Sequence, residues 1–264
     1  QTTTYTDPAD FDEGEQSNVT DDGSGQIVIS DEASAFDIIW IAASGRGTIL
    51  KLNTLTGAIL GEYLSAPNGH GRNPSRTTVD GNGSVWATNR NDSVNGQGSV
   101  VHIGTTENNQ CVDRNGNGII ETSTGLGDIK TWLNTGGVDS NGGVDTSADE
   151  CVIHFTRISS TGARHISVDK HNNIWAGGTG NRKFNLIDGT TGQIIRTEQS
   201  VGYGGYGGLI DDNDVIWSAS PFLRWDTSLP LSGVNGTNWN GLGHSSYGFC
   251  IDKNDNVWNT SIAD

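Results

Sequence analysis

The side chains best suited to chemistry form an oxygen-rich loop near the middle of the chain. The loop follows the pattern D-x-N-x-N-G-x, and its expected ligands are the side chains of Asp113, Asn115 and Asn117 and the carbonyl of Ile119. Side-chain oxygens at alternate positions of a curled loop converge on one point, and calcium prefers such ligands. The pattern therefore predicts a calcium site. The alternative is an Asn-Gly-rich turn that needs no metal.

The twelfth position of the loop departs from the calcium pattern. Thr124 stands there in place of the glutamate that binds calcium through both of its oxygens. A carboxylate from elsewhere in the segment would complete the shell, and the candidates are Glu121 at the ninth position, Asp128, Asp145, Asp149 and Glu150. Because two of the three side-chain ligands are Asn, we expect a modest affinity, as in extracellular modules.

Two cysteines bracket the segment that carries this loop. Cys111 lies just before Asp113, and Cys151 begins the next apolar stretch. A bridge between them would close a loop of about 40 residues, and the chain-entropy argument gives such a bridge about 3–4 kcal/mol. The alternative is a pair of buried thiols. The third cysteine, Cys250, is expected to pack as a small apolar residue.

One phrase recurs four times and defines the elements that must position these groups. In each copy an aliphatic residue precedes Asp, a polar turn rich in Asn and Gly follows, and an aliphatic residue and Trp close the unit. The copies are residues 79–86, 168–175, 210–217 and 251–258. This order is typical of a β-hairpin whose second strand is buried. The recurring Asp side chains are expected to bond the turn amides rather than to act as acids or bases.

The tryptophans that close these units give the period of the repeat. Trp175, Trp217 and Trp258 are 42 and 41 residues apart, whereas Trp86 and Trp175 are 89 apart, about twice the period. A second phrase, Thr-Gly between two aliphatic runs, adds a further hairpin to the unit. Four strands and one Trp per period near 42 residues are typical of β-propeller blades, in which the Trp packs between neighbouring blades.

The sequence therefore predicts an all-β fold, a β-propeller of about four and a half four-stranded blades. The propeller is expected over residues 26–264, with its first strand at 26–30 and only two strands in the last blade. Residues 105–150 lack strand alternation and are expected as an insertion, which carries the calcium loop, between the third and fourth strands of the second blade. Residues 1–25 are polar and are expected to form a linker or an extended arm.

Half a blade cannot close a propeller and leaves a strand edge unpaired. We therefore expect further blades beyond Asp264. The alternative is that another chain or the N-terminal arm supplies the missing strands.

Composition narrows the classes of partner and compartment. The formal net charge is −16, which argues against nucleic acid and anionic membranes as partners. No apolar stretch approaches the length of about 18 residues that a membrane-spanning helix needs. The chain contains no Met and begins at Gln1, so we expect a removed signal peptide or a fragment of a longer chain. Three cysteines favour an oxidising compartment, and we expect a secreted, extracellular or cell-surface protein.

The recurring Asp-turn-Trp phrase, preceded by a polar step, resembles the repeats of streptogramin lyase (virginiamycin B lyase)-like propellers, relatives of the NHL repeats. The resemblance covers roughly residues 36–104 and 151–262. It implies channel-facing His residues, a Glu and a bound Mg²⁺ that open a streptogramin ring by elimination. His165 alone stands at the start of an innermost strand, and Arg76, Gly207 and Gly248 occupy the equivalent places.

Several residues are candidates for binding a ligand at the channel mouth, namely Arg76, Tyr203, Tyr206 and His244. The two tyrosines belong to a run of paired glycines that ends at Gly208. This run is expected to form one wall of a ligand site. The alternative is a loop whose glycines allow close packing of the blades.

These observations favour a secreted or cell-surface, non-catalytic β-propeller used for binding, adhesion or extracellular assembly and stabilised by calcium. Its expected partner is an extracellular polymer or glycan, or another copy of the chain. The alternative is a streptogramin-lyase-like carbon–oxygen lyase that acts by elimination at the channel. In that alternative His165 is the general base and Mg²⁺ stabilises the enolate.

Overall fold

The structure is a computed structural model that describes residues 19–21, 27–29, 37–92, 96–136, 143–231, 236, 238–243, 246–252 and 256–261. The chain divides into two compact units, Gln1–Ile38 and Ile39–Asp264. In the first unit, β1 (Val19–Asp21) pairs antiparallel with β2 (Ile27–Ile29). The sequence analysis expected residues 26–30 to begin the first blade. The structure pairs residues 27–29 with β1 instead, because a run of Ile and Val specifies a strand but not its partner.

The second unit consists of antiparallel sheets whose strands follow chain order. Three sheets have four strands each. The first consists of β6 (Pro74–Val79), β7 (Val85–Asn89), β8 (Gln97–Ile103) and β9 (Val152–Thr161), and the second of β10 (Ala163–Val168), β11 (Ile174–Gly178), β12 (Lys183–Ile187) and β13 (Ile194–Gln199). The third consists of β14 (Gly208–Ile210), β15 (Val215–Ser218), β16 (Phe222–Asp226) and β17 (Trp239–Leu242). Two further sheets have fewer described strands: β3 (Ile38–Ala43), β4 (Thr48–Asn53) and β5 (Ile59–Leu64); and β18 (Ser246–Ile251) with β19 (Val257–Ser261).

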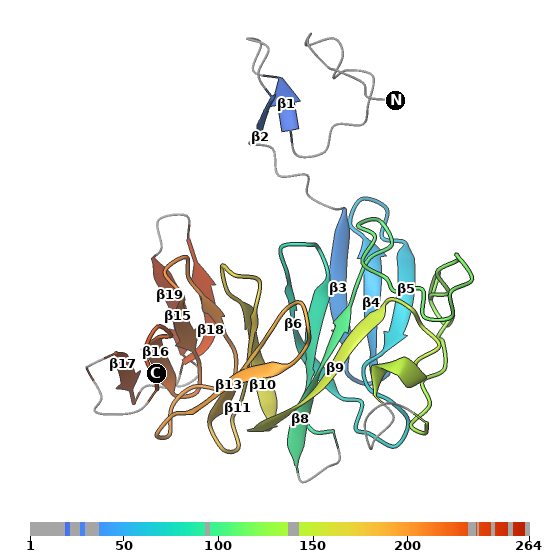
Figure 1. Cartoon of the computed structure of the whole chain (residues 1–264). Coiled ribbons are helices and arrows are strands. Elements are labelled where there is room, and N and C mark those ends of the chain that lie inside the picture. The colour runs from blue at the N-terminus through green and yellow to red at the C-terminus, as the bar shows by residue number, and fades with distance from the viewer. Residues whose placement is uncertain are drawn as a thin grey trace. The chain divides into compact units, whose positions relative to one another are not determined.

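This arrangement is all-β and consistent with a β-propeller. Figure 1 shows the sheets of the second unit following one another in chain order. The helical content of the described residues is one short 3-10 turn, η2 (Val144–Thr146). Within the described ranges no helix has the length and apolarity needed to cross a membrane.

The Asp-turn-Trp phrase has the structure that its sequence predicts. Asp80 Oδ1 accepts the backbone N–H groups of Asn82 and Ser84 at 2.9 and 3.0 Å, and Oδ2 accepts Trp86 Nε1–H at 3.0 Å. The bond from the tryptophan to the aspartate recurs in the third and fourth copies, at 2.9 Å from Trp217 to Asp211 and at 3.1 Å from Trp258 to Asp252. The recurring carboxylates are thus used by turn amides and indole groups.

The tryptophans of the second strands fill the spaces between successive sheets. Trp86 is fully buried in a cluster with Ile166 and Ile174 of the next sheet. Trp175 is packed in the same way with Trp225, ring centroids 4.9 Å apart. Trp258 in the last described sheet is 64% exposed. Burial of large aromatic rings between sheets therefore holds the central sheets together.

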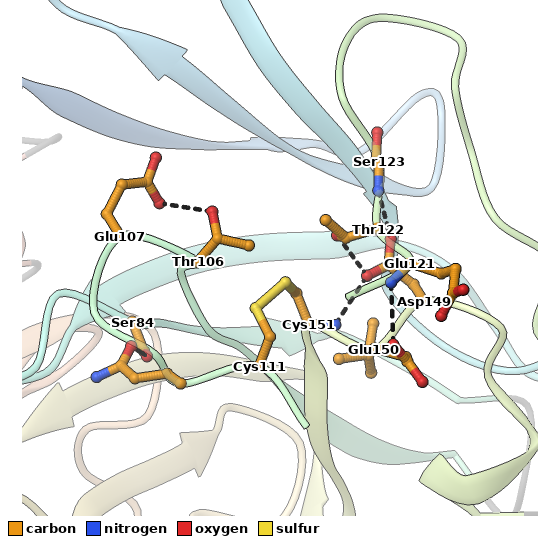
Figure 2. Close-up of a disulfide and its surroundings, with 12 residues drawn as sticks. Ser84, Thr106, Glu107, Cys111, Glu121, Thr122, Ser123, Asp149, Glu150 and Cys151 are labelled. Atoms are coloured by element: carbon orange, nitrogen blue, oxygen red, sulfur yellow. Dashed lines mark hydrogen bonds between the residues drawn. A yellow bond between two sulfur atoms is a disulfide. The ribbon is translucent and has the colours of Figure 1, made fainter. Parts of the chain in front are cut away.

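The segment between β8 and β9 lies where the sequence analysis placed an insertion, and it is tied down at three points. Cys111 and Cys151 form a disulfide at its neck, as the sequence predicts (Figure 2). Glu62 on β5 accepts the N–H of Gly127 at 2.9 Å, and Ser123 Oγ accepts the N–H of Glu62 at 2.8 Å. Cys250, which was expected to pack as a small apolar residue, is exposed instead.

Removing the bridge with the pair Cys111→Ala and Cys151→Ala is expected to lower the free energy of unfolding by about 3–4 kcal/mol, because the bridge restricts the unfolded chain. Urea unfolding followed by tryptophan fluorescence measures this loss. Cys250→Ala is the matched control, since its thiol is exposed, and it is expected to change stability by less than about 0.5 kcal/mol. A double variant as stable as the parent would contradict the prediction.

Candidate active site at the inner strands

The innermost strands of four successive sheets enclose a small pocket of about 180 Å³. Its wall carries two guanidinium groups, those of Arg76 on β6 and Arg164 on β10, and the backbone of Gly207, Gly208 and Gly248. No carboxylate is among the residues that line this pocket. In a chain with a net charge of −16, a pocket lined by cations is a local exception, and it favours an anionic ligand.

Tyr206 lies between the two arginines. The guanidinium carbons of Arg76 and Arg164 lie 5.4 and 4.8 Å from the centroid of its ring. Arg164 Nη1 also donates a hydrogen bond to the phenol oxygen of Tyr206 at 3.3 Å. A Cβ atom at Gly207 would lie 3.3 Å from Arg76 Nη2. The lack of a side chain at this position therefore lets Arg76 approach the backbone next to Tyr206.

A third arginine adds positive charge beside the pocket. Burial first, and then the positive charges of Arg164 and Arg76, lower the pKa of Arg90 below its ordinary value. The Nε atom of Arg90 is buried and has no hydrogen-bond partner among the described residues. Arg76 and Arg164 likewise form no ion pair with any carboxylate in the described part of the chain. An anion from solution would meet positive charge that the described carboxylates leave uncompensated.

Two tyrosine hydroxyls meet at the edge of the pocket. The phenol oxygens of Tyr206 and Tyr247 are 3.1 Å apart. The hydrogen bond between the two hydroxyls and the charges of Arg164 and Arg76 lower the pKa of Tyr206. The same bond raises the pKa of Tyr247. Two neighbouring groups whose pKa values are driven apart are suited to act as a base and an acid.

His165, the predicted general base, lies buried behind the pocket wall. The register of β10 against β11 shifts between Ala163 and His165, so Arg164 is the extra residue of a bulge. A bulge changes the direction in which the following side chains point. Arg164 lines the pocket, whereas the ring of His165 contacts Ser218 Oγ through Nδ1 at 3.2 Å and Ser167 Oγ through Nε2 at 3.0 Å.

The residues predicted to bind a ligand do not all lie at the pocket. Arg76 and Tyr206 come together at the pocket. Tyr203 packs away from it, with its ring centroid 5.8 Å from that of Trp239, and it does not line the pocket. His244 lies outside the described residues.

Sequence reasoning missed Arg164 and Tyr247, which complete the site. Arg164 directly precedes His165, and Tyr247 is the second residue of β18, the innermost strand of the last copy. The sequence did contain a signal for both residues, because they lie at the starts of innermost strands, as Arg76 does. The bulge in β10 decides which residue of the Arg164–His165 pair faces the pocket, and the sequence does not reveal that bulge.

The predicted calcium loop is a tight turn whose side chains bond its own backbone. Asp113 accepts the N–H of Gly118 at 2.8 Å, which is the main cause of the lowered pKa of Asp113. The side-chain amides of Asn115 and Asn117 donate to Glu121 at 2.9 and 2.7 Å. The described residues contain no group of three or more His, Cys, Asp or Glu side chains arranged to hold a metal ion. The loop brings the predicted oxygens together, but two of them belong to amides.

Most of the carboxylates expected to complete the calcium shell already have partners. Glu150 accepts the N–H groups of Arg114 and Glu121 at 2.8 and 2.9 Å (Figure 2). Asp149 accepts hydrogen bonds from Thr122, Ser123 and Cys151. The N–H of Ile119, whose carbonyl is a predicted ligand, donates to Asn117 Oδ1 at 2.8 Å. Asp128 bonds Thr124 and Lys130. Glu121 is therefore the carboxylate in closest association with the loop.

Three buried histidines make stability depend on pH. Burial lowers the pKa of His165 and that of His154 to about 4, and it also lowers the pKa of His102. All three are neutral in the folded protein over a range in which the unfolded chain takes up protons. Stability is therefore complete above about pH 6.5 and is lost as the pH falls towards 4, by up to about 1.4 kcal/mol per pH unit for each histidine.

Urea unfolding at pH 7, 6 and 5 measures this loss. His154→Gln is expected to reduce the slope, because one of the three groups no longer titrates. The pKa of Glu62 is lowered to about 2, chiefly by its hydrogen bond from Arg46. Glu62 therefore changes the stability only below the ordinary pKa range of a carboxyl group, and it does not affect the comparison between pH 7 and pH 5. Equal stability at pH 7 and pH 5 would contradict the prediction.

No protein family and no curated protein matches the chain. Solved structures do, and one of them is a gluconolactonase from Xanthomonas campestris, 12% identical, with a TM-score of 0.49. The match covers 85% of this chain and 65% of that structure, so the chain spans less than two thirds of its length.

This comparison corrects one expectation. The sequence analysis favoured a non-catalytic propeller used for binding, adhesion or assembly, whereas the matched structure belongs to an enzyme. The non-catalytic interpretation is therefore set aside. The function of this chain has to be argued from its own pocket, because a likeness of this degree does not carry an activity from one protein to another.

Proposed function

We propose that the chain is a carbon–oxygen lyase that eliminates an oxygen leaving group from a small carboxylate-bearing substrate. The observation that carries this proposal is the placement of Arg76 and Arg164 on Tyr206, at the edge of a pocket whose lining has no carboxylate. The resemblance to streptogramin lyases supports elimination as the type of reaction. The residues assigned to it here differ from those that the resemblance implies.

Each side chain of the pocket has one role in this reaction. Arg76 and Arg164 bind the substrate carboxylate, and they stabilise the additional negative charge that develops on it when the neighbouring carbon loses its proton. Tyr206, as the phenolate, accepts that proton, and the electron pair of the C–H bond becomes the new carbon–carbon double bond. The C–O bond breaks, and Tyr247 gives its proton to the leaving oxygen. Proton transfer between the two hydroxyls, 3.1 Å apart, restores the starting state.

Magnesium, which the lyase resemblance implies, does not suit this pocket. Its lining offers two guanidinium groups and hydroxyl groups but no carboxylate, whereas a hard divalent cation is bound by carboxylate and carbonyl oxygens. The guanidinium groups take the place of a cation opposite the carboxylate. We therefore derive no step through Mg²⁺.

The substrate is a single sugar-acid unit rather than an acidic polymer. The pocket volume of about 180 Å³ is small compared with the 300–1,000 Å³ that is usual for ligand sites. The net charge of −16 repels a long polyanion, while the local cluster of arginines attracts one carboxylate. An extracellular acidic glycan is the source that fits such a unit.

The test is the ultraviolet absorbance of the double bond formed from 4-O-methylglucuronate, which carries an oxygen substituent one carbon beyond the acidic C–H. The proposal predicts an increase with this substrate and none with its methyl ester, which lacks the charge that Arg76 and Arg164 bind. Equal activity on acid and ester, or hydrolysis of gluconolactone in the absence of any elimination, would refute it.

A calcium ion bound by Asp113, Asn115, Asn117, Ile119 and Glu121 is part of the same proposal, as is secretion to an oxidising compartment. The disulfide between Cys111 and Cys151 supports the compartment. The hydrogen bonds from Asn115 and Asn117 to Glu121 support the site, because they bring these side chains within one ion's reach. Rotating each side-chain amide by half a turn about its terminal C–C bond would exchange its nitrogen and oxygen. Both amide oxygens would then face the same point as the carboxylate of Glu121.

Calcium is expected to raise the melting temperature of the protein by several degrees, since an ion bound only by the folded state stabilises it. Thermal melting in millimolar calcium and in excess chelator measures the difference. Asp113→Asn with Glu121→Gln is expected to remove the response. A chelator without effect on the parent protein would eliminate the calcium site.

A further inference from the structure

The backbone that carries Tyr206 passes through a run of glycines held very close to other strands. A Cβ atom at Gly205 would lie 2.4 Å from the carbonyl oxygen of Gly178, and one at Gly208 would lie 1.9 Å from that of Trp217. Such close approach requires glycine. Because glycines do not restrict their own conformation, something else must fix the position of Tyr206 between the arginines.

Ser218 provides this restraint from β15. Its hydroxyl is fully buried; it accepts the N–H of Gly205 at 2.8 Å and donates to the carbonyl of Gly207 at 2.9 Å. One side chain therefore bonds the residues on both sides of Tyr206. Three further bonds between main-chain groups, from Gly204 to Pro221, from Tyr206 to Ala219 and from Ala219 to Gly207, keep the loop along the same strand end.

His165 completes the network. The single hydroxyl proton of Ser218 goes to Gly207, so the contact between His165 Nδ1 and Ser218 Oγ, at 3.2 Å, requires a proton on Nδ1. Nε2 then has a lone pair and accepts from Ser167 Oγ at 3.0 Å. The ring is buried and packs edge-on against Phe184, with ring centroids 5.4 Å apart. Both nitrogens of His165 are thus used, and its tautomer is fixed.

We propose that His165 is a positioning residue for Tyr206 and acts through Ser218 and the backbone of Gly205 and Gly207. The histidine donates to Ser218, which directs the hydroxyl proton to Gly207. Tyr206 is thereby kept at the distances from Arg76 and Arg164 at which both guanidinium groups act on its phenol. The consequence for catalysis rests on the proposed lyase function, whereas the positioning itself does not.

The position of Tyr206 is measured without any substrate, by titrating its phenol. The absorbance of tyrosinate is compared between each variant and the same variant with Tyr206→Phe. His165→Leu and Ser218→Ala are expected to raise the pKa of Tyr206 by about one unit, since an opposite charge within a few ångströms shifts a pKa by about 1–3 units. His165→Asn is the matched control, because its side-chain N–H takes the place of Nδ1–H and should leave the titration close to that of the parent.

An unchanged Tyr206 titration in folded His165→Leu and Ser218→Ala proteins would overturn the proposal, as would equal effects of Leu and Asn. If these variants do not fold, the ¹⁵N chemical shifts of His165 in the parent protein decide the question. The Nδ1–H tautomer is required, and the Nε2–H tautomer would overturn the network. A shifted titration without lyase activity on any sugar acid would leave the positioning role intact and refute only the proposed reaction.

Discussion

Tyr206→Phe is expected to lower kcat for elimination about 10²–10⁴-fold, which is the usual contribution of one positioned general base. The phenyl ring still fits between Arg76 and Arg164, so KM should change by less than about threefold. Steady-state kinetics on 4-O-methylglucuronate measures both quantities. The fold should be retained, because the hydroxyl is at the pocket edge and only its bonds to Arg164 and Tyr247 are lost.

Tyr203→Phe is the matched control for this variant. Tyr203 belongs to the same loop but packs against Trp239, whereas Tyr206 is the ring that Arg76 and Arg164 approach. The kcat of Tyr203→Phe should therefore remain within about twofold of the parent. The pH profile gives a second criterion. The rise in kcat with pH, caused by deprotonation of Tyr206, should disappear in Tyr206→Phe. A variant with the activity of the parent would remove Tyr206 from the mechanism.

Arg164→Gln is expected to weaken binding of a carboxylate about 10–100-fold, because a charge-assisted hydrogen bond contributes about 1.5–3 kcal/mol. Isothermal titration calorimetry with glucuronate measures the change. Arg76→Gln should have an effect of the same order, and the double variant should bind no glucuronate at accessible concentrations. Raising the salt concentration should weaken binding to the parent and have less effect on either single variant.

The control for the arginine variants is Arg224→Gln. The guanidinium of Arg224 lies 5.4 Å from the ring of Trp217, a contact of the same kind as those of Arg76 and Arg164, but Arg224 does not line the pocket. Its replacement should leave glucuronate binding unchanged. A similar loss in all three single variants would mean that net charge, and not the pocket, attracts the anion.

Much of the fold can be predicted from the sequence because the repeat fixes local geometry. The Asp-turn-Trp phrase determines a hairpin through bonds within six residues, as from Trp86 to Asp80, and the Trp spacing determines the sheet. Residues 26–30 were predicted as the first strand of the first blade, whereas residues 27–29 pair with β1, because a run of Ile and Val specifies a strand but not its partner. The disulfide could be predicted because Cys111 and Cys151 lie at the two ends of a segment without strand alternation.

The site was harder to predict than the fold, for a physical reason. Arg164 faces the pocket and His165 faces the interior because of one bulge in β10, and a shift of one residue reverses the two faces of a strand. The sequence therefore directed attention to the histidine instead of the arginine beside it. The pairing of Tyr206 with Tyr247 depends on contact between residues 41 apart in the sequence, which the repeat pattern does not specify.

The most direct test of the central claim is proton NMR of 4-O-methylglucuronate incubated with the protein in D₂O. The account predicts that the signal of the C–H next to the carboxylate disappears while a vinyl proton signal and free methanol appear together. It also predicts that neither change occurs with Tyr206→Phe, whose pocket retains Arg76 and Arg164. An unchanged substrate spectrum with the parent protein, or the same product formed at the same rate by Tyr206→Phe, would contradict it.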